Sequence, residues 1–417
     1  MEDLTIDNVA DKVAKRPLPL FNPRDPDFIR DPYPTYHRLR RQSPLLWDPA
    51  GNYWLATSYD VCSEILRDRR FGRRYEAHIE NIYRRGMMDQ TAFRLMAMTM
   101  LMQEPPNHAR LRGLVTEAFS ARRVVLMRQR IRTLVGDLLD QLVPRGTMDV
   151  IRDFAHVLPV TVICDMLGVP AEDTRLFHET TISTRMLDPV PMNESELREA
   201  NAMFEEQGAY FTNLFERRRR DPEDDLITAL VQVGDGGGLT DDELLANVWL
   251  LFAAGHETTR NLIGNGLLAL HRNPGQLARL QLDPSLIPSA VTELLRYDSP
   301  VQFVGRTALE DTDIAGTTIA EGQVVLCLVG AANRDPAKFG EPDLLDFGRS
   351  NNRPLSFGGG IHFCLGAQLT QIEGQEAFVG ILSRLPGMRL HDADEPSWQP
   401  NFAIHGLKTL MASWDPA

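Results

Sequence analysis

The segment that follows Thr240 constrains the fold more than any other part of the sequence. It reads TDDELLANVWLLFAAGHETTRNLIGNGLLALHRNPG. Thr240 and Glu243, three residues apart, form a capping box that predicts a helix start, and Asn273–Pro274 ends the helix. The middle of the segment is apolar on almost all sides. We therefore predict a long helix that runs through the core of the molecule.

Small and polar residues interrupt this core helix at 254–259, with the sequence AGHETT. A glycine inside a helix costs up to about 1 kcal/mol relative to alanine, and a buried carboxylate is costly unless it is satisfied. HETTR begins like the zincin motif HExxH, but Arg260 occupies the second histidine position, so a zinc ligand is missing. Two interpretations stay open. The segment is a helix kink with a polar face, or a flat ligand or diatomic lies against it while acid and hydroxyl pass protons.

A second unusual stretch, SFGGGIHFCLG at 356–366, surrounds a single cysteine with glycines and precedes a predicted helix at Gln368–Leu385. It is not a dinucleotide-binding loop, because the third glycine of GxGxxG falls on Phe363. Taken alone, the stretch fits an ordinary surface loop. Loop composition alone favours that interpretation, and the alternative is a backbone that must turn tightly or lie flat against something.

Composition excludes several classes of protein. The 417 residues carry a net charge of −13, which argues against a nucleic-acid binder. The four cysteines are far apart and form no CxxC pair, so we expect a reducing, cytoplasmic setting without a zinc ribbon or dithiol motif. We find neither a signal peptide nor a run of apolar residues long enough to span a membrane, and expect no membrane anchor.

Secondary-structure patterns predict a mainly α fold with a small β region in a single domain, residues 1–417. Helical periodicity dominates about 58–300 and 366–385. Predicted helices there are Tyr59–Arg67, His108–Phe119, Val124–Leu142 and Ser195–Arg219. Sheet-forming runs concentrate at about 44–57, 301–330 and 386–417. The run of four arginines at 217–220 is followed by acidic residues, and we interpret it as a solvated, self-compensated helix end.

Three motifs in order identify the family that the chain resembles. AGHETT, the pair Glu293 and Arg296 in ELLR, and the cysteine stretch resemble the cytochrome P450 superfamily of haem-thiolate monooxygenases. The cysteine stretch is similar to that family's FxxGxxxCxG, and the resemblance extends over nearly the whole chain, including NRDP at 333–336 and HARLR at 108–112. It implies a triangular, α-rich body that holds haem b between the central helix and the helix after the cysteine.

The resemblance also implies roles for individual residues. Cys364 is expected to be the thiolate ligand of the haem iron, stabilised by loop amides and by the helix that starts near Gly366. Glu293 and Arg296, with Arg349, are expected to form an ion-pair network that braces the cysteine loop. The remaining expected site residues are Phe357, which shields the sulfur; His108, Arg112, Arg306 and His362, which pair with the propionates; Ala254 and Gly255, where oxygen binds; and Glu257 and Thr258, which deliver protons.

By the same resemblance, the chain is a cytoplasmic, monomeric monooxygenase of secondary metabolism. It takes O2 and receives electrons from a ferredoxin and an NAD(P)H-dependent ferredoxin reductase. Arginines beside the propionate helix, Arg110, Arg122 and Arg123, are expected to form a basic docking patch. A peroxide-using member of the family, which would usually lack the acid–threonine pair, and a non-catalytic haem-binding sensor are the rival functions.

We expect the substrate to be a bulky, largely apolar small molecule such as a steroid, terpenoid or polyketide, which is hydroxylated or epoxidised. By position in the family that the chain resembles, the pocket is expected to be lined by residues 75–102, 251–254, 301–304 and 402–405, with Gln302, Asn401 and His405 as hydrogen-bonding groups. A fatty acid or another carboxylate is the alternative substrate. Its carboxylate would be held by arginines that we place in an outer segment, namely Arg73, Arg74, Arg84 and Arg85.

Overall fold

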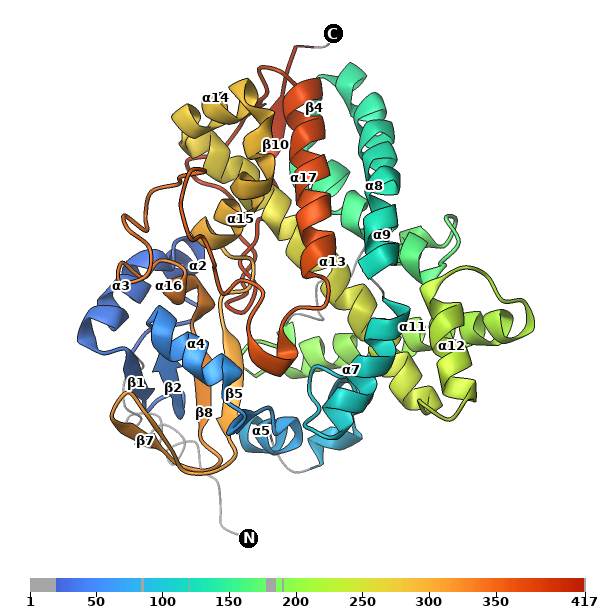
Figure 1. Cartoon of the computed structure of the whole chain (residues 1–417), viewed down its shortest axis with the longest axis vertical. Helices are drawn as coiled ribbons and strands as arrows, with labels where there is room; N and C mark the ends of the chain where they lie inside the picture. Colours follow the sequence, from blue (N-terminus) through green and yellow to red (C-terminus); the bar gives the residue numbers. More distant parts are fainter. Residues whose placement is uncertain (1–19, 84–85, 120, 178–184, 190, 416–417) are drawn as a thin grey trace.

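Helices make up most of the chain (Figure 1). The computed structural model describes residues 20–83, 86–119, 121–177, 185–189 and 191–415. Its α-helices are α2 Pro26–Arg30, α3 Tyr33–Gln42, α4 Tyr59–Arg67, α5 Tyr75–Ile82, α6 Thr91–Ala97, α7 Asn107–Ala118, α8 Ala121–Leu142, α9 Val157–Leu167, α11 Glu194–Arg220, α12 Leu226–Asp235, α13 Asp241–Arg272, α14 Pro274–Leu282, α15 Ile287–Tyr297, α16 Val329–Ala332 and α17 Ala367–Arg384. The helices predicted from periodicity are confirmed to within a few residues at each end.

Helix α13 crosses the middle of the molecule (Figure 1). Its capping box is formed as predicted. The Glu243 amide donates to the Thr240 hydroxyl at 3.2 Å, and the Thr240 amide donates to the Glu243 carboxylate at 3.0 Å. Most of the helix is buried, and it packs against α6, α9, α11, α12, α14, α15 and α17. This burial explains why a long stretch of the sequence has no polar face.

The strands are short and lie mainly on one side of the helical body (Figure 1). One sheet has the order β1-β2-β8-β5-β3, in which β2 pairs in parallel with β8 and the other pairs are antiparallel. A second sheet has the order β4-β10-β9, and β6 and β7 form a hairpin. The strands are β1 Leu45–Asp48, β2 Tyr53–Ala56, β3 Phe71–Gly72, β4 Thr147–Asp149, β5 Val304–Ala308, β6 Thr312–Ile314, β7 Thr317–Ile319, β8 Val324–Cys327, β9 Arg389–Leu390 and β10 Met411–Ser413.

Helices α17 and α8 lie side by side and cover one flank of the core (Figure 1). A Cβ atom on Gly380 of α17 would lie 2.3 Å from Val135 Cγ1 of α8, so this glycine allows the two helices to approach closely. Helix α17 also packs against α13 and α15. The residues that precede α17, which include Cys364, are therefore held next to the central helix. None of the described helices combines the length and apolar composition needed to cross a bilayer.

The arginine run at the end of α11 differs in part from its prediction. Its charges are compensated as expected, since Arg219 pairs with acidic side chains such as Asp241. Arg218, however, is 4% exposed and is bound by Asp225 and Glu223. The prediction of a solvated helix end is wrong for this residue, because α12 folds back against α11 and buries it.

Candidate functional site

A cavity lies between α13 and the loop that contains Cys364. Apart from His108, every residue expected to hold haem or oxygen or to deliver protons lines it. From α13 come Ala254, Gly255, Glu257 and Thr258; from β5 comes Arg306; from α7 comes Arg112; and from the cysteine loop come Phe357, His362, Cys364 and Gly366. His108 is buried beside them, with its ring centroid 4.4 Å from that of His362. Residues from four separate parts of the sequence thus meet at one place.

Backbone contacts hold the cysteine loop in shape. The Cys364 amide donates a hydrogen bond to the Phe357 carbonyl at 3.0 Å, and α17 begins directly after Gly366. Burial raises the pKa of the Cys364 thiol, whereas the backbone amides of Gly366 and Ala367 and the Arg112 guanidinium act to lower it. The sulfur therefore faces the donors that stabilise a thiolate, as the helix start predicts.

Of the two explanations that the sequence offered for the glycines of this loop, a tight turn fits Gly360. Gly360 has a φ of +65°, and a Cβ atom there would lie 2.3 Å from the Leu66 carbonyl oxygen in α4. Gly359 also faces Leu66, at 3.3 Å. A backbone lying flat against a bound ring is therefore not what requires Gly360. This residue must be glycine because the loop turns tightly against α4.

A cluster of cationic and imidazole side chains closes one end of the cavity. Burial, followed by the charges of nearby arginines, lowers the pKa of His362 to about 2 and also lowers the pKa of His108. Arg73 and Arg306 both donate to the Gly305 carbonyl, at 3.1 and 2.9 Å. In the described part of the chain, no hydrogen-bond partner meets the buried Nε2 atoms of the two histidines or Nε of Arg73.

This cluster fits a group that carries negative charge. The cluster contains three arginines and two imidazoles, and the buried nitrogen atoms of Arg73, His108 and His362 that lack a partner require acceptors, because unpaired buried polar atoms are costly. Two propionates would supply them, and the Cys364 sulfur lies in the same cavity. The residues present thus fit haem b. No group of three or more His, Cys, Asp or Glu that could hold a metal ion occurs among the described residues.

The polar residues of α13 divide between two faces of the helix. Thr258 donates to the Ala254 carbonyl at 3.3 Å, the contact one turn back that the sequence suggested. Glu257 lines the cavity yet is only 1% exposed. Thr259 faces away toward α17 and donates to Glu373 at 3.3 Å, and burial raises the pKa of that carboxyl group to about 8. Helix α13 therefore presents an acid and a hydroxyl to the cavity side by side.

Gly255 has a second role beyond lining the cavity. A Cβ atom at this position would lie 3.0 Å from Ile163 Cγ1 on α9. The glycine therefore permits close packing of α9 on α13 as well as access to the helix backbone from the cavity.

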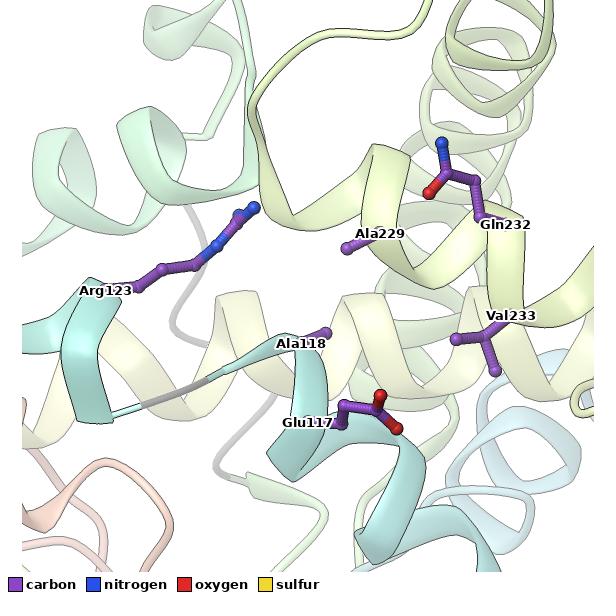
Figure 2. A pocket seen from close by; sticks show the side chains of 6 residues that line it. All are labelled: Glu117, Ala118, Arg123, Ala229, Gln232 and Val233. Carbon is purple, nitrogen blue, oxygen red and sulfur yellow. The ribbon is translucent and has the colours of Figure 1, made fainter.

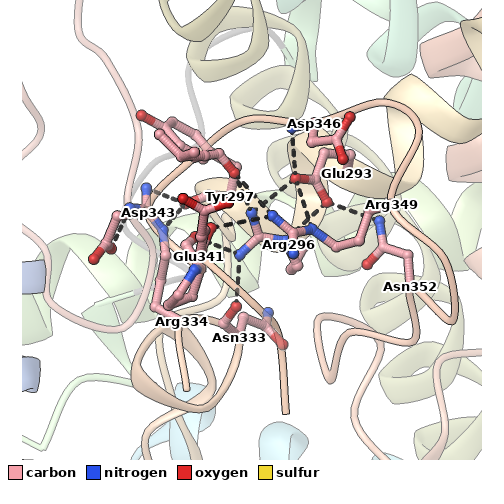
Figure 3. A network of polar contacts seen from close by, with 12 residues as sticks. Glu293, Arg296, Tyr297, Asn333, Arg334, Glu341, Asp343, Asp346, Arg349 and Asn352 are labelled. Carbon is pink, nitrogen blue, oxygen red and sulfur yellow. Dashed lines mark hydrogen bonds and ion pairs between the residues drawn. The ribbon is translucent and has the colours of Figure 1, made fainter. Parts of the chain in front are cut away.

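Glu293 of α15 is the centre of a buried polar network (Figure 3). Its carboxylate accepts two hydrogen bonds from Arg296, both at 2.8 Å, and one from Arg349 at 3.2 Å. Arg296 also donates to the Asn333 carbonyl at 2.9 Å. The Asn333 side chain in turn donates to the Ser356 hydroxyl at 2.9 Å. The ion-pair network expected from the sequence is present, and Asn333 connects it to the start of the cysteine loop.

Apolar side chains form the walls of the cavity above these polar groups. All four predicted stretches contribute, and the lining includes Met96, Met100, Leu101, Ile163, Leu187, Trp249, Leu250, Leu251, Val301, Phe303, Val304, Ala403 and Ile404. An isolated β-bridge between Val301 and Ile404 joins two of these stretches. Among the described lining residues, the arginines are Arg73, Arg112 and Arg306, which gather with the imidazole of His362 at the polar end.

The three predicted hydrogen-bonding groups are not part of the cavity. Gln302 accepts from the Tyr36 hydroxyl at 2.8 Å and donates to the Ser299 carbonyl at 2.7 Å. His405 contacts Asp298 at 2.9 Å and stacks on Trp398. Asn401 accepts from the Ile404 amide. The prediction is wrong for all three, because local contacts in the folded chain occupy these side chains.

Arg73 is the main site residue that sequence reasoning misplaced. We placed it in an outer segment with Arg74, Arg84 and Arg85, but its side chain is in the cavity beside Arg306. Arg74 pairs with Glu321 outside the cavity at 2.8 Å. Arg84 and Arg85 lie outside the described residues. Only the antiparallel pairing of β3 with β5, in which Phe71 lies opposite Ala308 and Gly72 opposite Thr307, reveals the location of Arg73, the next residue along the chain.

A separate surface hollow of about 320 Å³ lies between α7, α8 and α12 (Figure 2). Its polar lining residues are Glu117, Arg123 and Gln232. Arg123 also pairs with Asp224 at 2.8 Å, so its charge is already compensated. This hollow contains neither a thiol nor an imidazole among its lining residues and is not the chemical site.

Comparisons with known proteins agree with this geometry. The family model "Cytochrome P450" matches residues 69–283 and 285–404. Vitamin D(3) 25-hydroxylase of Pseudonocardia autotrophica is 39% identical, covering 93% of this chain and 95% of its own. The polyketide biosynthesis cytochrome P450 PksS of Bacillus subtilis is 36% identical, covering 94% and 98%. The crystal structure of P450BioI with an acyl carrier protein ligated to hexadec-9Z-enoic acid has a TM-score of 0.87 and 37% identity, covering 94% and 100%.

Sequence motifs, the cavity over the cysteine and these similarities lead to one conclusion. The chain belongs to the cytochrome P450 family, whose members are monooxygenases that bind haem b through a cysteine thiolate.

Proposed function

We propose that this protein inserts an oxygen atom into a bulky, largely apolar small molecule such as a steroid, terpenoid or polyketide. The observation that carries this proposal is the distribution of charge around the cavity. The walls are apolar, and the cationic lining residues gather at the polar end, where the propionates would engage them. Burial of apolar surface, at roughly 25 cal/mol per Å², is then the main source of affinity.

In this proposal Cys364 would bind the haem through its thiolate, and Arg73, Arg112, Arg306, His108 and His362 would hold the propionates. When bound, the haem supplies the activation of O2 and the oxygen-atom transfer, which thiolate donation favours. Phe357 shields the sulfur side, and Ala254 and Gly255 leave room beside α13.

The chain's own residues then handle the protons. Glu257 takes up a proton at its carboxylate oxygen and delivers it to the cavity, and the Thr258 hydroxyl holds the hydrogen-bonded acceptor in place. The reaction consumes O2, two electrons and two protons. One oxygen atom leaves with the two protons as water, and the other oxygen atom enters the product.

We further propose that the electrons come from a ferredoxin and its NAD(P)H-dependent reductase. The docking surface would include Arg112, whose guanidinium donates to the Phe363 carbonyl at 2.6 Å, next to the 47% exposed Phe363 side chain. Arg110 already pairs with Glu243, and Arg123 with Asp224, so their charges are partly compensated. The side chain of Arg122 lies outside the described residues.

A second candidate substrate is a fatty acid or an acyl chain. It is favoured by the similarity to P450BioI, whose structure contains a fatty-acyl-ligated carrier protein. It is disfavoured because the described arginines within the cavity are needed at its polar end.

Titration of the ferric protein decides between the two candidates. We would follow the low-to-high-spin shift with polycyclic compounds and with chain-matched fatty acids. We expect complete shifts with ring compounds. Tight shifts with fatty acids alone would reverse the ranking.

A separate experiment tests whether Cys364 is the cysteine that binds the haem. Cys364→Ser should abolish the strongly red-shifted Soret band of the reduced, CO-bound protein. The matched controls, Cys62→Ser, Cys164→Ser and Cys327→Ser, alter free, buried cysteines and should retain the band. Loss of the band in a control, together with its retention in Cys364→Ser, would show that the ligand is assigned wrongly.

A further inference from the structure

A buried arginine follows Glu257 one helical turn later. Arg260 Nη2 lies 3.8 Å from Glu257 Oε1, and the two side chains are 6% and 2% exposed. Glu257 lines the cavity, whereas Arg260 is not among the residues that do. The arginine thus contacts the acid from outside the cavity. Positions three apart on a helix share a face, so α13 itself fixes this arrangement.

The arginine needs an anion at this place. Burial lowers the pKa of Arg260, and the charge of Glu257 opposes that shift. Arg260 Nε donates to Asn261 Oδ1 at 3.3 Å, but no hydrogen-bond partner for its buried Nη2 occurs among the described residues. A buried guanidinium without a counter-charge is unfavourable by on the order of several kcal/mol. Conversely, a carboxyl group buried without a cation would be neutral.

The distance between Arg260 and Glu257 shows which kind of interaction joins them. At 3.8 Å the contact between Arg260 and Glu257 is an ionic contact rather than a hydrogen bond, so Arg260 acts on the carboxylate through its charge.

Other titratable groups surround this part of α13. His256 donates from Nδ1 to the Phe252 carbonyl at 2.9 Å, and the ring of His156, at the start of α9, is 6.0 Å from its ring. On the α17 side, Glu373 is bound by Thr259. Arg260 is the cation that the described structure places within ion-pair distance of Glu257.

We propose that Arg260 is a positioning residue for proton delivery, which keeps Glu257 ionised at the cavity wall and therefore able to accept a proton from solvent. This inference rests on the proposed role of Glu257. The proton that Glu257 gains comes from the solvent side and leaves toward the acceptor held by Thr258. Arg260 keeps its own proton throughout, and Glu257 returns to the carboxylate form after each transfer.

Infrared difference spectroscopy of the ferric protein at neutral pH tests the ion pair without turnover. Arg260→Met removes the charge at similar length, and we expect it to produce a carboxylic acid C=O band that is absent from the double variant Arg260→Met/Glu257→Gln. Wild type minus Glu257→Gln should show no such band, and Arg260→Lys should resemble wild type. Glu373, with its raised pKa, contributes equally to each spectrum and cancels.

The matched control is Arg272→Met. Arg272 is on the same helix but donates to the Ala393 carbonyl far from the acid, so this variant should give the wild-type spectrum. A carboxylic acid band from Glu257 in wild type would overturn the proposal. Its absence from Arg260→Met would do the same.

Turnover with surrogate ferredoxin and reductase provides the second test, with the ring compound that gives the largest spin-state shift. Arg260→Met should lower product per NAD(P)H by about tenfold, within the range of general acid–base effects. When Glu257 is already glutamine, adding Arg260→Met should alter the product per NAD(P)H less than about twofold, because the two residues act as one unit. Equal effects in both backgrounds would overturn the proposal.

Different results would overturn the role of Glu257 and the role of Arg260. Normal turnover by Glu257→Gln would overturn the proton-delivery role of Glu257 and, with it, the positioning role of Arg260. Slow turnover by Glu257→Gln, combined with an ionised Glu257 in Arg260→Met, would overturn the role of Arg260 alone.

Discussion

Replacing Glu293 with glutamine should destabilise the protein more than most single substitutions. The carboxylate is fully buried and accepts five hydrogen bonds, from Arg296 (two), Arg349, Asn352 and the Asp346 amide. Glutamine keeps the shape but removes the charge, so Arg296 and Arg349 remain buried without an anion. Breaking a buried ion pair from one side costs about 3–5 kcal/mol. We expect Glu293→Gln to lose that much unfolding free energy.

The network gives an internal comparison for this prediction. Arg349→Met leaves the bidentate pair between Glu293 and Arg296 intact, so its cost should be about 1–3 kcal/mol. The double variant Glu293→Met/Arg296→Met removes the two charges of the bidentate pair, so that Arg349 is the one arginine of the network that loses its anion, and it should be more stable than Glu293→Gln. Equilibrium urea unfolding followed by far-UV circular dichroism, with refolding checked from urea, measures all three free energies.

Glu293→Gln should also change the position of the loop that contains Cys364. The network reaches Ser356 through Asn333, so loosening it should let the loop shift. We expect a smaller fraction of Glu293→Gln to show the red-shifted band of the reduced, CO-bound protein. A Glu293→Gln protein with nearly the stability of wild type and a full band would refute the reasoning that this ion pair braces the loop.

Three further predictions follow from the site. Thr258→Ala should unfold at nearly the same urea concentration as wild type. It should yield about tenfold less product per NAD(P)H, with more peroxide or water. An unchanged product yield per NAD(P)H would indicate that protons enter by another route. Burial raises the pKa of Glu373 to about 8, so wild type should lose stability as pH rises from about 4.5 through 8, whereas Glu373→Gln should not. The gain of the variant over wild type should approach roughly 5 kcal/mol by pH 8; a difference that does not depend on pH would contradict this. Arg73→Met should lose haem about tenfold faster, because a charge-assisted contact to a propionate is removed, while keeping the Soret position; an unchanged loss rate would exclude Arg73 from the propionate site.

Local signals were enough to predict the elements that carry the site. The capping box at Thr240 and the apolar run after it specify α13 with nearly correct ends, because capping and hydrophobic periodicity act within a few residues. The glycines around Cys364 likewise indicate an unusual backbone, because glycine adopts conformations that other residues rarely do. The spacing of Glu293 and Arg296 placed them on one face of a helix, and they do form an ion pair.

Tertiary structure decided which groups meet, because contacts between distant segments have no local signature. Gln302 and His405 look like pocket residues along the chain, yet Tyr36 and Asp298 occupy their polar atoms. Arg73 looked peripheral until the pairing of β3 with β5 brought it to the cavity. Gly360 is required by the carbonyl of Leu66, a residue that lies far from it in the sequence. The chemical type of a side chain limits which groups it can bind, but only the tertiary structure determines which of those groups lies within contact distance.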